Sequence, residues 1–508
     1  MTTVAIASST QLAADGGAAL ARMGGNAVDC AIAASLVSVV TEPGICSLGS
    51  GGYLTIAAPG EDPVTIDGYV TMPGRDLPAG HSPDGAIRAH MEYGGGVDLV
   101  VGHASVATPG ALAACGVASR RFGRLPWVSL FEPAHGHARD GFPLQNVSYN
   151  YLRCSQDAVF NWNEDSFAAI HDPEGNLLRP GETVRVAHLA ESIELIAEEG
   201  PEAFYSGSLA TLIEQDSLAN GGFLTRADLE SFEPIIRDPI AVEGETWSVY
   251  TNPQPAVGGA TLAAMLMLMR GRPSEGWTTD ELSHWVKVQR AVLGFRRDRL
   301  DPSTDISRDV EALLVAARTG ELGDFQPSPS TVHTSAVDST GLACAVTLSA
   351  GYGSGVMPPG TGIWMNNCLG ELELNQRGVD WPVGIRLPSN MAPTVARRGD
   401  GAVLTIGSAG SSRITTAIMQ SLSNFMNAGM TLREALAHPR VHVEEAESGW
   451  QVAYEPGMPA EELDMPSRAF EDLNMFFGGV GVALWTPDHG FSVAADPRRG
   501  GGTAIAGT

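Results

Sequence analysis

The sequence predicts an α/β protein in which a mainly helical first part is followed by a β-rich last part. Helical periodicity dominates residues 110–300, and strand-like alternation begins at Val332. The length of 508 residues exceeds the roughly 250–300 residues at which a single core stops growing. We therefore expect one large α/β unit built from two interlocked segments, or two to three domains.

The helices of the first part are predicted from apolar residues that recur with the helical period. They cover residues 11–23, 31–40, 187–199, 261–269 and 310–317. Gly24-Gly25 ends the first of them, and Glu42-Pro43-Gly44 closes the second. A glycine-rich turn over 48–52 then leads into an expected strand over 53–58.

The pattern changes near residue 330. Residues 320–330 contain Gly323, Pro327 and Pro329 and show little apolar periodicity, which is typical of an exposed tether where a chain can be cut. Residues 332–337 and 342–348 alternate on either side of a turn, which predicts a β-hairpin. A strand over 402–406 and a helix over 412–426 follow.

Composition excludes several classes of partner. The net charge of -27 repels nucleic acid and anionic membrane surfaces, so we expect neither as a partner. The six cysteines are scattered without metal-ligand spacing. No basic segment followed by an apolar run opens the chain, and its apolar stretches are too short to span a bilayer. A reduced, cytoplasmic setting is the expectation.

The chemistry-bearing candidate is Ser330-Thr331, where the tether meets the hairpin. The signatures of serine α/β-hydrolases, zinc peptidases, NTPases and dinucleotide-binding enzymes are absent from the sequence. A threonine hydroxyl can attack the preceding carbonyl in an N-to-O acyl shift, and hydrolysis of the resulting ester then leaves a new N-terminus. The freed α-amine has a pKa of about 7.7–8 and can serve as the base for the same hydroxyl. Taken alone, a threonine at a strand start is an ordinary β-branched residue.

The surrounding sequence resembles the gamma-glutamyltransferase family. Thr331-Val332-His333-Thr334-Ser335-Ala336-Val337-Asp338 is similar to the run that opens the small subunit of these enzymes. Further segments match in the same order: 24–29, 48–53, 108–110, 138–142, 258–259, 353–355, 359–363, 366–367, 387–394 and 407–414. The resemblance runs from about residue 4 to Asp496-Pro497-Arg498.

This resemblance implies the αββα four-layer sandwich of the N-terminal-nucleophile (Ntn) hydrolases. A large subunit, residues 1–330, and a small subunit, residues 331–508, would form it jointly as one catalytic unit after autocleavage between Ser330 and Thr331. The two fragments would remain together as a heterodimer, and any higher assembly stays open.

The resemblance also assigns catalytic roles. Thr331 is the nucleophile, and Ser349 stands where the family has a threonine that contacts it. Gly410 and Ser411 fall at the two backbone N–H groups of the oxyanion hole, just before a helix N-terminus that favours negative charge. Ser411 replaces a glycine there. His333 is interpreted as a structural histidine of the hairpin, since the free α-amine acts as the base in this family.

The donor end of the site departs from the family pattern. Tyr69, in Asp67-Gly68-Tyr69-Val70, stands where the family has the arginine that binds the substrate α-carboxylate. Loss of such a pair should weaken a glutamyl donor by about tenfold to a hundredfold or more. Arg75 and Arg386 are candidates to replace it, and efficient glutathione breakdown is not expected.

Five other positions complete the expected substrate pocket. Glu371 keeps a carboxylate, one methylene longer than in the family, that can hold a substrate ammonium. Cys368 is interpreted as a small pocket residue rather than a redox centre, and Gly351 replaces a family asparagine. Ser389 keeps the first member of a serine pair, and Asn390 replaces the second.

Three functions remain open from the sequence. The first is a threonine-nucleophile hydrolase or acyltransferase that acts through an acyl-enzyme on a gamma-glutamyl-like amide or a related amino-acid-derived small molecule. The second is an Ntn hydrolase of specialised-metabolite biosynthesis that cleaves another amide or a C–C bond. The third is a non-catalytic binding protein of the same fold. None of the three implies a metal or an organic cofactor.

Overall fold

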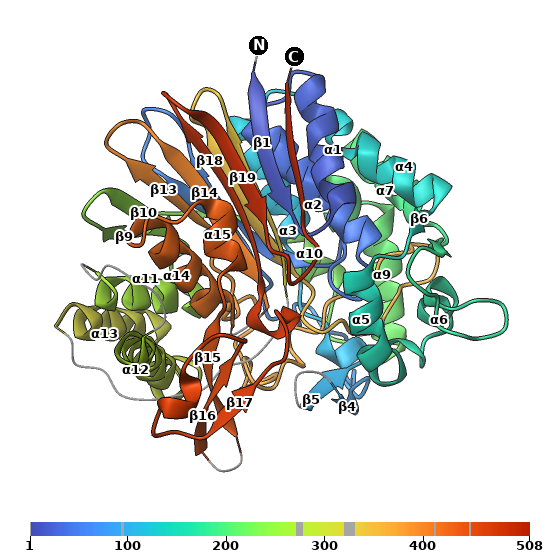
Figure 1. The fold of residues 1–508 in the computed structure, drawn as a ribbon. Coiled ribbons are helices and arrows are strands. Elements are labelled where there is room, and N and C mark those ends of the chain that lie inside the picture. The colour runs from blue at the N-terminus through green and yellow to red at the C-terminus, as the bar shows by residue number, and fades with distance from the viewer. Residues whose placement is uncertain are drawn as a thin grey trace.

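Two β-sheets pack face to face at the centre of the molecule, with helices on both outer sides (Figure 1). The computed structural model describes residues 2–92, 96–270, 278–319, 331–410, 413–446 and 449–507. The seven-stranded sheet has the order β20-β1-β11-β12-β2-β3-β8, and the six-stranded sheet has the order β19-β18-β14-β13-β10-β9. The αββα four-layer sandwich predicted from the sequence is confirmed.

Each large sheet takes strands from both sides of residue 331. The seven-stranded sheet contains β1 (Thr3–Ser8), β2 (Gly51–Ala57), β3 (Val64–Gly68), β8 (Ile235–Arg237), β11 (Val332–Asp338), β12 (Ala343–Ser349) and β20 (Gly502–Gly507). The six-stranded sheet contains β9 (Ile240–Glu243), β10 (Trp247–Thr251), β13 (Thr394–Arg398), β14 (Val403–Ala409), β18 (Gly479–Thr486) and β19 (Gly490–Ala495). The two segments are therefore interlocked, and neither builds a large sheet alone.

Three smaller sheets lie outside the sandwich. They are β4 (Ile87–Met91) with β5 (Val97–Val101), β6 (Phe142–Pro143) with β7 (Thr183–Val184), and β15 (Val441–Ala446) with β16 (Gly449–Tyr454) and β17 (Ser467–Ala469).

Separate groups of helices cover the outer faces of the two sheets. The seven-stranded sheet packs against α1 (Gln11–Arg22), α2 (Ala27–Thr41) and α3 (Ala111–Phe122). The six-stranded sheet packs against α11 (Val257–Leu268), α14 (Arg413–Met426) and α15 (Leu432–Ala437), with α12 (Thr279–Phe295) and α13 (Ile306–Thr319) against α11. The remaining helices are α4 (Glu132–Asp140), α5 (Asn146–Ser155), α6 (Glu164–Ile170), α7 (Leu189–Glu199), α8 (Glu202–Tyr205), α9 (Ser208–Ala219) and α10 (Arg226–Glu230).

Local patterns located the helices better than the strands. All five helices predicted in the first part exist, and the hairpin appears as β11 and β12. The sequence did not predict β1 or β8, whose partners lie far along the chain, where local periodicity does not record them. It also did not predict the local hairpin of β9 and β10, whose strands are only four and five residues long. The predicted tether over 320–330, with Ser330, lies outside the described residues.

Small side chains line the layer between the two sheets. They include Ala5, Ala57, Val337, Ala345 and Ala483. Successive strand residues point to opposite faces, so Thr331 and His333, which share the parity of Val337, face the six-stranded sheet. His333 lies directly against Gly407 of β14, where a Cβ would approach its ring to 2.3 Å. The Ala-rich layer thus gives way to polar groups at the start of β11.

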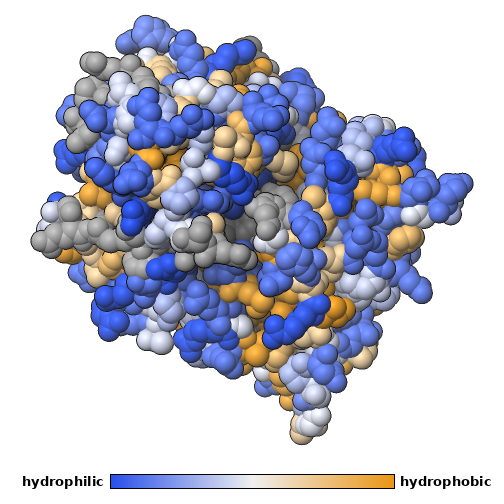
Figure 2. Space-filling view, turned by 60° about the horizontal axis from the view of Figure 1, so that its bottom comes forward, coloured by the Kyte–Doolittle hydropathy of each residue, from blue (hydrophilic) through white to orange (hydrophobic). Residues whose placement is uncertain are grey.

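The face of the molecule drawn in Figure 2 is mainly hydrophilic, and smaller hydrophobic patches interrupt it. In the part of the chain that the structure describes, no helix has the length and apolar character needed to cross a bilayer.

Candidate active site

Thr331 and Ser349 lie together at one end of the layer between the sheets. The register pairs Val332 with Leu348, and continuing it by one residue places Thr331 opposite Ser349. Ser349 in turn pairs with Gly51 of β2. Both side chains are buried, with Thr331 2% and Ser349 4% exposed. The hairpin therefore brings the candidate nucleophile and its candidate partner to adjacent strands, facing the second sheet.

The turn at Gly410, which directly follows β14, lies close to Thr331. Ala409, the last residue of β14, lines the same small cavity as Thr331. Gly410 has a φ of +115°, and a Cβ there would come within 2.6 Å of Gly478 Cα, so the turn requires glycine. The Gly410 carbonyl accepts a hydrogen bond from the Arg413 N–H (3.0 Å) at the start of α14. Ser411, the other predicted oxyanion residue, lies outside the described residues.

Tyr69 forms part of an aromatic wall. It is 2% exposed, and its ring stacks on Tyr53 with centroids 5.7 Å apart. Its hydroxyl donates a hydrogen bond to Cys368 Sγ (3.6 Å). Burial raises the pKa of Tyr69 and that of the Cys368 thiol well above their usual values, so both side chains are neutral. The Tyr69 position therefore carries a buried, neutral aromatic side chain instead of the arginine that the sequence resemblance led us to expect.

Glu371 places a buried carboxyl group near Tyr69 and Cys368. The residue is 4% exposed, and its Oε1 has no hydrogen-bond partner among the described residues. Burial, and then the nearby Glu373, raise the pKa of Glu371 to about 8. Gly351 faces it, and a Cβ there would lie 2.9 Å from Oε1. Glycine at position 351 therefore permits the close packing of Asn367 and Glu371 against this turn, and Glu371 Oε1 is an acceptor without a partner among the described residues.

The two arginines considered as replacements for the missing donor arginine have other partners. Arg386 donates to the main-chain carbonyls of Tyr69 (2.8 Å) and Glu233 (2.6 Å), and its Nε lies 3.4 Å from Asp67 Oδ1. Arg75 is partly exposed, and its Nε lies 4.0 Å from Asp228 Oδ1. Arg386 thus fixes the main chain around Tyr69, and each of the two guanidinium groups already lies beside a carboxylate of the protein.

The loop with Ser389 and Asn390 is fixed to the start of α11. The Ser389 carbonyl accepts hydrogen bonds from the N–H groups of Val257 (2.8 Å) and Gly258 (3.0 Å). Its hydroxyl accepts one from the Met391 N–H (3.2 Å). A Cβ at Gly258 would approach the Asn390 carbonyl to 2.1 Å, so the glycine permits this close contact.

His333 is held as a neutral structural residue. Its ring nitrogens lie 2.9 Å from Thr347 Oγ1 and 2.9 Å from Ser335 Oγ. Burial lowers its pKa to about 3. Both nitrogens have partners within the seven-stranded sheet, in agreement with the structural role expected from the sequence.

The sequence interpretation did not assign a function to two charged residues that share a cavity with Thr331. The cavity is lined by Ser9, Glu42, Thr331, Arg499 and neighbouring residues, and has a volume of about 20 Å³. Glu42 was interpreted only as a helix terminator, and Arg499 had no assignment. Only the fold brings these segments together, and no local motif marks them.

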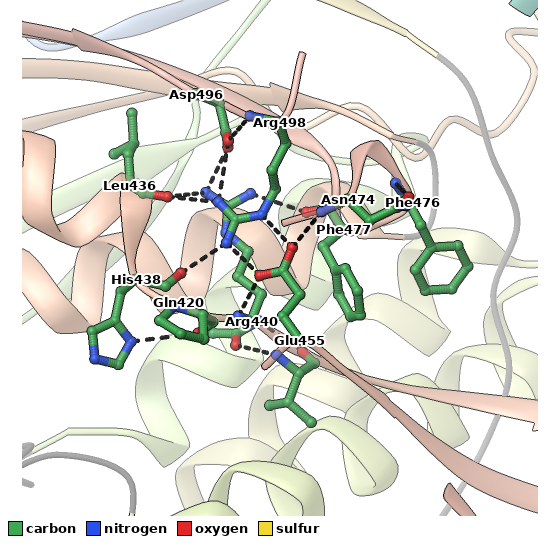
Figure 3. Close-up of polar contacts among 12 residues, drawn as sticks. Gln420, Leu436, His438, Arg440, Glu455, Asn474, Phe476, Phe477, Asp496 and Arg498 are labelled. Atoms are coloured by element: carbon green, nitrogen blue, oxygen red, sulfur yellow. Dashed lines mark hydrogen bonds and ion pairs between the residues drawn. The ribbon is translucent and has the colours of Figure 1, made fainter. Parts of the chain in front are cut away.

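A buried ion cluster supports the segment that leads to Arg499 (Figure 3). Arg498 donates to Glu455 Oε1 (2.7 Å) and to Asp496 Oδ1 (3.1 Å). Arg440 Nη2 lies 2.7 Å from Asp496 Oδ2. Two arginines and two carboxylates thus balance one another in the interior. The sequence offered one signal for this cluster, the matched Asp496-Pro497-Arg498 end.

Among the residues that the structure describes, no group of three or more His, Cys, Asp or Glu side chains is placed to hold a metal ion.

Comparison with known proteins agrees with this architecture. The family model for gamma-glutamyltranspeptidase matches residues 13–506. The glutathione hydrolase proenzyme of Pseudomonas aeruginosa is 28% identical over 99% of this chain and 94% of its own length. The acylase ACY 1 proenzyme of Pseudomonas sp. (strain V22) is 28% identical over 97% of this chain and 92% of its own length. The crystal structure of cephalosporin acylase from Bacillus halodurans has the same fold, with a TM-score of 0.82 at 24% identity over 99% of this chain and 96% of its own. The chain therefore belongs to the gamma-glutamyltranspeptidase family of amide-hydrolysing and acyl-transferring enzymes.

Proposed function

We propose that this chain is an autoprocessed Ntn hydrolase or acyltransferase with Thr331 as its nucleophile. The observation that carries the proposal is the buried position of Thr331 at the start of β11, opposite Ser349 and beside the turn at Gly410. The proenzyme names of its relatives support a maturation step. Strands from 1–330 and 331–508 share both sheets, so the two fragments would remain associated as a heterodimer.

The proposed reaction uses one hydroxyl twice. In maturation, Thr331 Oγ1 attacks the Ser330 carbonyl and the peptide C–N bond breaks, which forms an ester and frees the Thr331 α-amine. Hydrolysis of the ester then separates the two chains and frees the Thr331 hydroxyl. In turnover, this amine takes the proton from the hydroxyl as the hydroxyl attacks the substrate amide, and then delivers the proton to the leaving amine. The N–H groups of Gly410 and Ser411 stabilise the oxyanion. Water or an acceptor amine then releases the acyl group.

The proposed substrate is an amide whose acyl group carries an ammonium group. Glu371 would accept its hydrogen bonds, and Ser389 and Asn390 would border the same end of the pocket. Tyr69 replaces the arginine that would bind a carboxylate, and Arg386 is bonded to main-chain carbonyls. The amino group therefore contributes more to recognition than an adjacent carboxylate. A glutathione hydrolase and an acylase among the relatives are compatible with this class.

A second candidate function follows from the aromatic wall. The stacked Tyr53 and Tyr69 suit a larger apolar or aromatic acyl group, as in an acylase or an Ntn hydrolase of specialised metabolism that cleaves another amide or a C–C bond. The cytoplasm is the location that we propose, in keeping with six free cysteines.

Intact-mass spectrometry and N-terminal sequencing test the nucleophile. We expect the wild-type chain to yield two fragments, the smaller beginning Thr331-Val332-His333, and Thr331→Ala to remain one chain. Thr331→Ser is the matched control, because it keeps a hydroxyl and should still be cut. Normal two-chain processing of Thr331→Ala would refute the proposal.

Three p-nitroanilides test the substrate class. Gamma-glutamyl-p-nitroanilide carries both an ammonium and a carboxylate, the 4-aminobutanoyl analogue carries the ammonium alone, and the glutaryl analogue carries the carboxylate alone. We expect kcat/KM for the 4-aminobutanoyl compound to equal or exceed that for the gamma-glutamyl compound, with the glutaryl compound poorest. A preference for glutaryl over 4-aminobutanoyl would contradict the role given to Glu371. Activity only on aromatic acyl anilides would favour the second candidate function.

A further inference from the structure

Thr331 has a second polar neighbourhood, away from the substrate pocket. Tyr69 directly follows β3 and contacts Cys368, whereas the cavity with Glu42 and Arg499 takes part of its lining from β1 and β18. Its volume of about 20 Å³ is close to the space that one water molecule requires. The cavity is too small for an acyl substrate, and this restricts its role to a small species such as water.

Arg499 offers hydrogen-bond donors that nothing in the described chain accepts. Its Nε and Nη2 are buried and without a hydrogen-bond partner among the described residues. A buried donor left unpaired costs about 1–3 kcal/mol, and more when it is charged. A water in the cavity would accept such a bond, which explains how a guanidinium can remain in this position.

Glu42 supplies the matching acceptor. It is 1% exposed, directly follows α2 and lines the cavity. Its carboxyl accepts a hydrogen bond from the Ser9 hydroxyl. Burial raises the pKa of Glu42 to about 7, while Ser9, Ser38 and Arg499 act in the opposite direction. A carboxyl that ionises near neutral pH is suited to accept a proton during a reaction.

The other titratable groups around the cavity are already engaged. Asp496 binds Arg440 and Arg498. His333 has hydrogen bonds at both ring nitrogens, and its pKa is lowered to about 3. Of the two carboxyl groups among the described lining residues, Asp496 forms ion pairs with arginines and Glu42 does not.

We propose that this cavity holds the water that hydrolyses the ester formed during self-cleavage, with Arg499 donating to that water and Glu42 taking its proton. The inference rests on the proposed function of Thr331. In the step, the water oxygen bonds to the Ser330 carbonyl carbon, and the bond from that carbon to Thr331 Oγ1 breaks. One water proton passes to Glu42, and Thr331 Oγ1 regains a proton. The products are a carboxylate at Ser330 and a free hydroxyl and α-amine at Thr331.

A cleavage time course on the full chain tests this assignment. The protein is made by cell-free synthesis, transferred to buffers from pH 5.5 to 8.5, and followed by gel and intact mass. For the wild type, we expect the cleavage rate to rise about tenfold per pH unit below about pH 7 and to level off above it, because Glu42 must be ionised. Glu42→Gln should cleave roughly 100-fold or more slowly, without this pH dependence.

Matched variants separate a chemical role from a structural one. Arg499→Met should slow cleavage and move the inflection to higher pH, since Arg499 lowers the pKa of Glu42. Glu42→Asp should restore part of the pH-dependent rate. Glu373→Gln is the control, because burial also raises the pKa of Glu373 to about 7 but Glu373 does not line the cavity; its cleavage profile should match the wild type. Thermal unfolding of each variant in an uncut Thr331→Ala background reports folding separately.

Hydroxylamine distinguishes ester hydrolysis from ester formation. It attacks esters without needing a base to activate water, so it should rescue cleavage of Glu42→Gln and leave a hydroxamate at Ser330. Wild-type cleavage rates in Glu42→Gln, or a slow rate that keeps the wild-type pH slope, would overturn the inference while Thr331 remains the nucleophile. Cleavage of Thr331→Ala, by contrast, would remove the proposed function and this inference together.

Discussion

Replacing Glu371 by glutamine should make the protein more stable in mild alkali. The change keeps the shape of the side chain and removes its charge. Burial and the nearby Glu373 raise the pKa of Glu371 from 4.5 to about 8, so the folded state binds its proton more tightly than the unfolded state does. The stability that this proton contributes is complete below about pH 4.5 and is lost as the pH rises through about 8.

The size of the effect follows from the shift. One pKa unit corresponds to about 1.36 kcal/mol, so a pKa raised from 4.5 to about 8 lowers the free energy of unfolding by roughly 5 kcal/mol above pH 8. Glu373 shares part of this effect, because the two carboxyls titrate together. Urea unfolding at pH 5 and pH 8.5 measures the difference. We expect Glu371→Gln to match the wild type at pH 5 and to exceed it by several kcal/mol at pH 8.5.

The same variant should lose recognition of the ammonium group. KM for the gamma-glutamyl and 4-aminobutanoyl anilides should rise roughly tenfold to a hundredfold, as expected for a hydrogen bond to a charged group of about 1.5–3 kcal/mol. KM for the glutaryl compound should stay constant. In the wild type, KM for the amine-bearing substrates should fall as pH rises toward about 8, where Glu371 ionises. A variant that is less stable at pH 8.5, or that loses all three substrates equally, would refute the reasoning.

Three further substitutions test the backbone and the ion cluster. Gly410→Ala places a Cβ 2.6 Å from a backbone atom at a φ of +115°, so we expect loss of processing or a roughly 100-fold lower kcat in a folded chain; wild-type kcat would contradict the oxyanion role. Gly351→Asn introduces the residue expected from the family and puts a Cβ 2.3 Å from Asn367 Oδ1. We expect it to lower the free energy of unfolding in urea by about 1–3 kcal/mol. An unchanged urea midpoint would show that the asparagine side chain fits at this position. Arg498→Met removes a cation that binds the buried carboxylates of Glu455 and Asp496. We expect it to lower the free energy of unfolding by about 3–5 kcal/mol at neutral pH and the added Glu455→Gln change to restore part of this loss. No recovery in the double variant would mean that lost packing rather than unpaired charge explains the lower stability.

The part of the site that could be predicted from the sequence lies on one hairpin and its adjoining turn. Alternation located β11 and β12. A threonine behind a tether made Thr331 a candidate, but the family resemblance was needed to assign it the role of nucleophile, which stays a prediction. The hairpin register then places Ser349 opposite it, as local pairing rules allow. The proximity of Tyr69 to Cys368 rested on resemblance alone, because these residues lie on separate strands and loops that only tertiary packing brings together.

The cavity residues show why the rest could not be predicted. Glu42 follows α2, all of whose residues are buried, and its position before Pro43 indicates only the end of that helix. Its relevance comes from Arg499, near the other end of the chain, and from β1, which the periodicity did not reveal. Long-range antiparallel pairing of β1 with β11 and β20 creates this neighbourhood, and no window of the sequence contains it.

The charge balance of the substrate pocket narrows the class of ligand. Among the described groups that shift the pKa of Glu371, none is a cation, and the neighbouring Tyr69 and Cys368 are neutral. A buried carboxylate without a cation is unfavourable, so Glu371 is mainly the neutral acid at pH 7. A ligand that brings an ammonium group alone forms a balanced pair with the ionised carboxylate. A glutamyl zwitterion brings, in addition, a carboxylate that Arg386, bonded to main-chain carbonyls, does not neutralise. If Glu371 binds the acyl group as proposed, the neutral Tyr69 therefore favours a monocationic acyl group over a zwitterionic one, and the proposed role of Thr331 is the same for both.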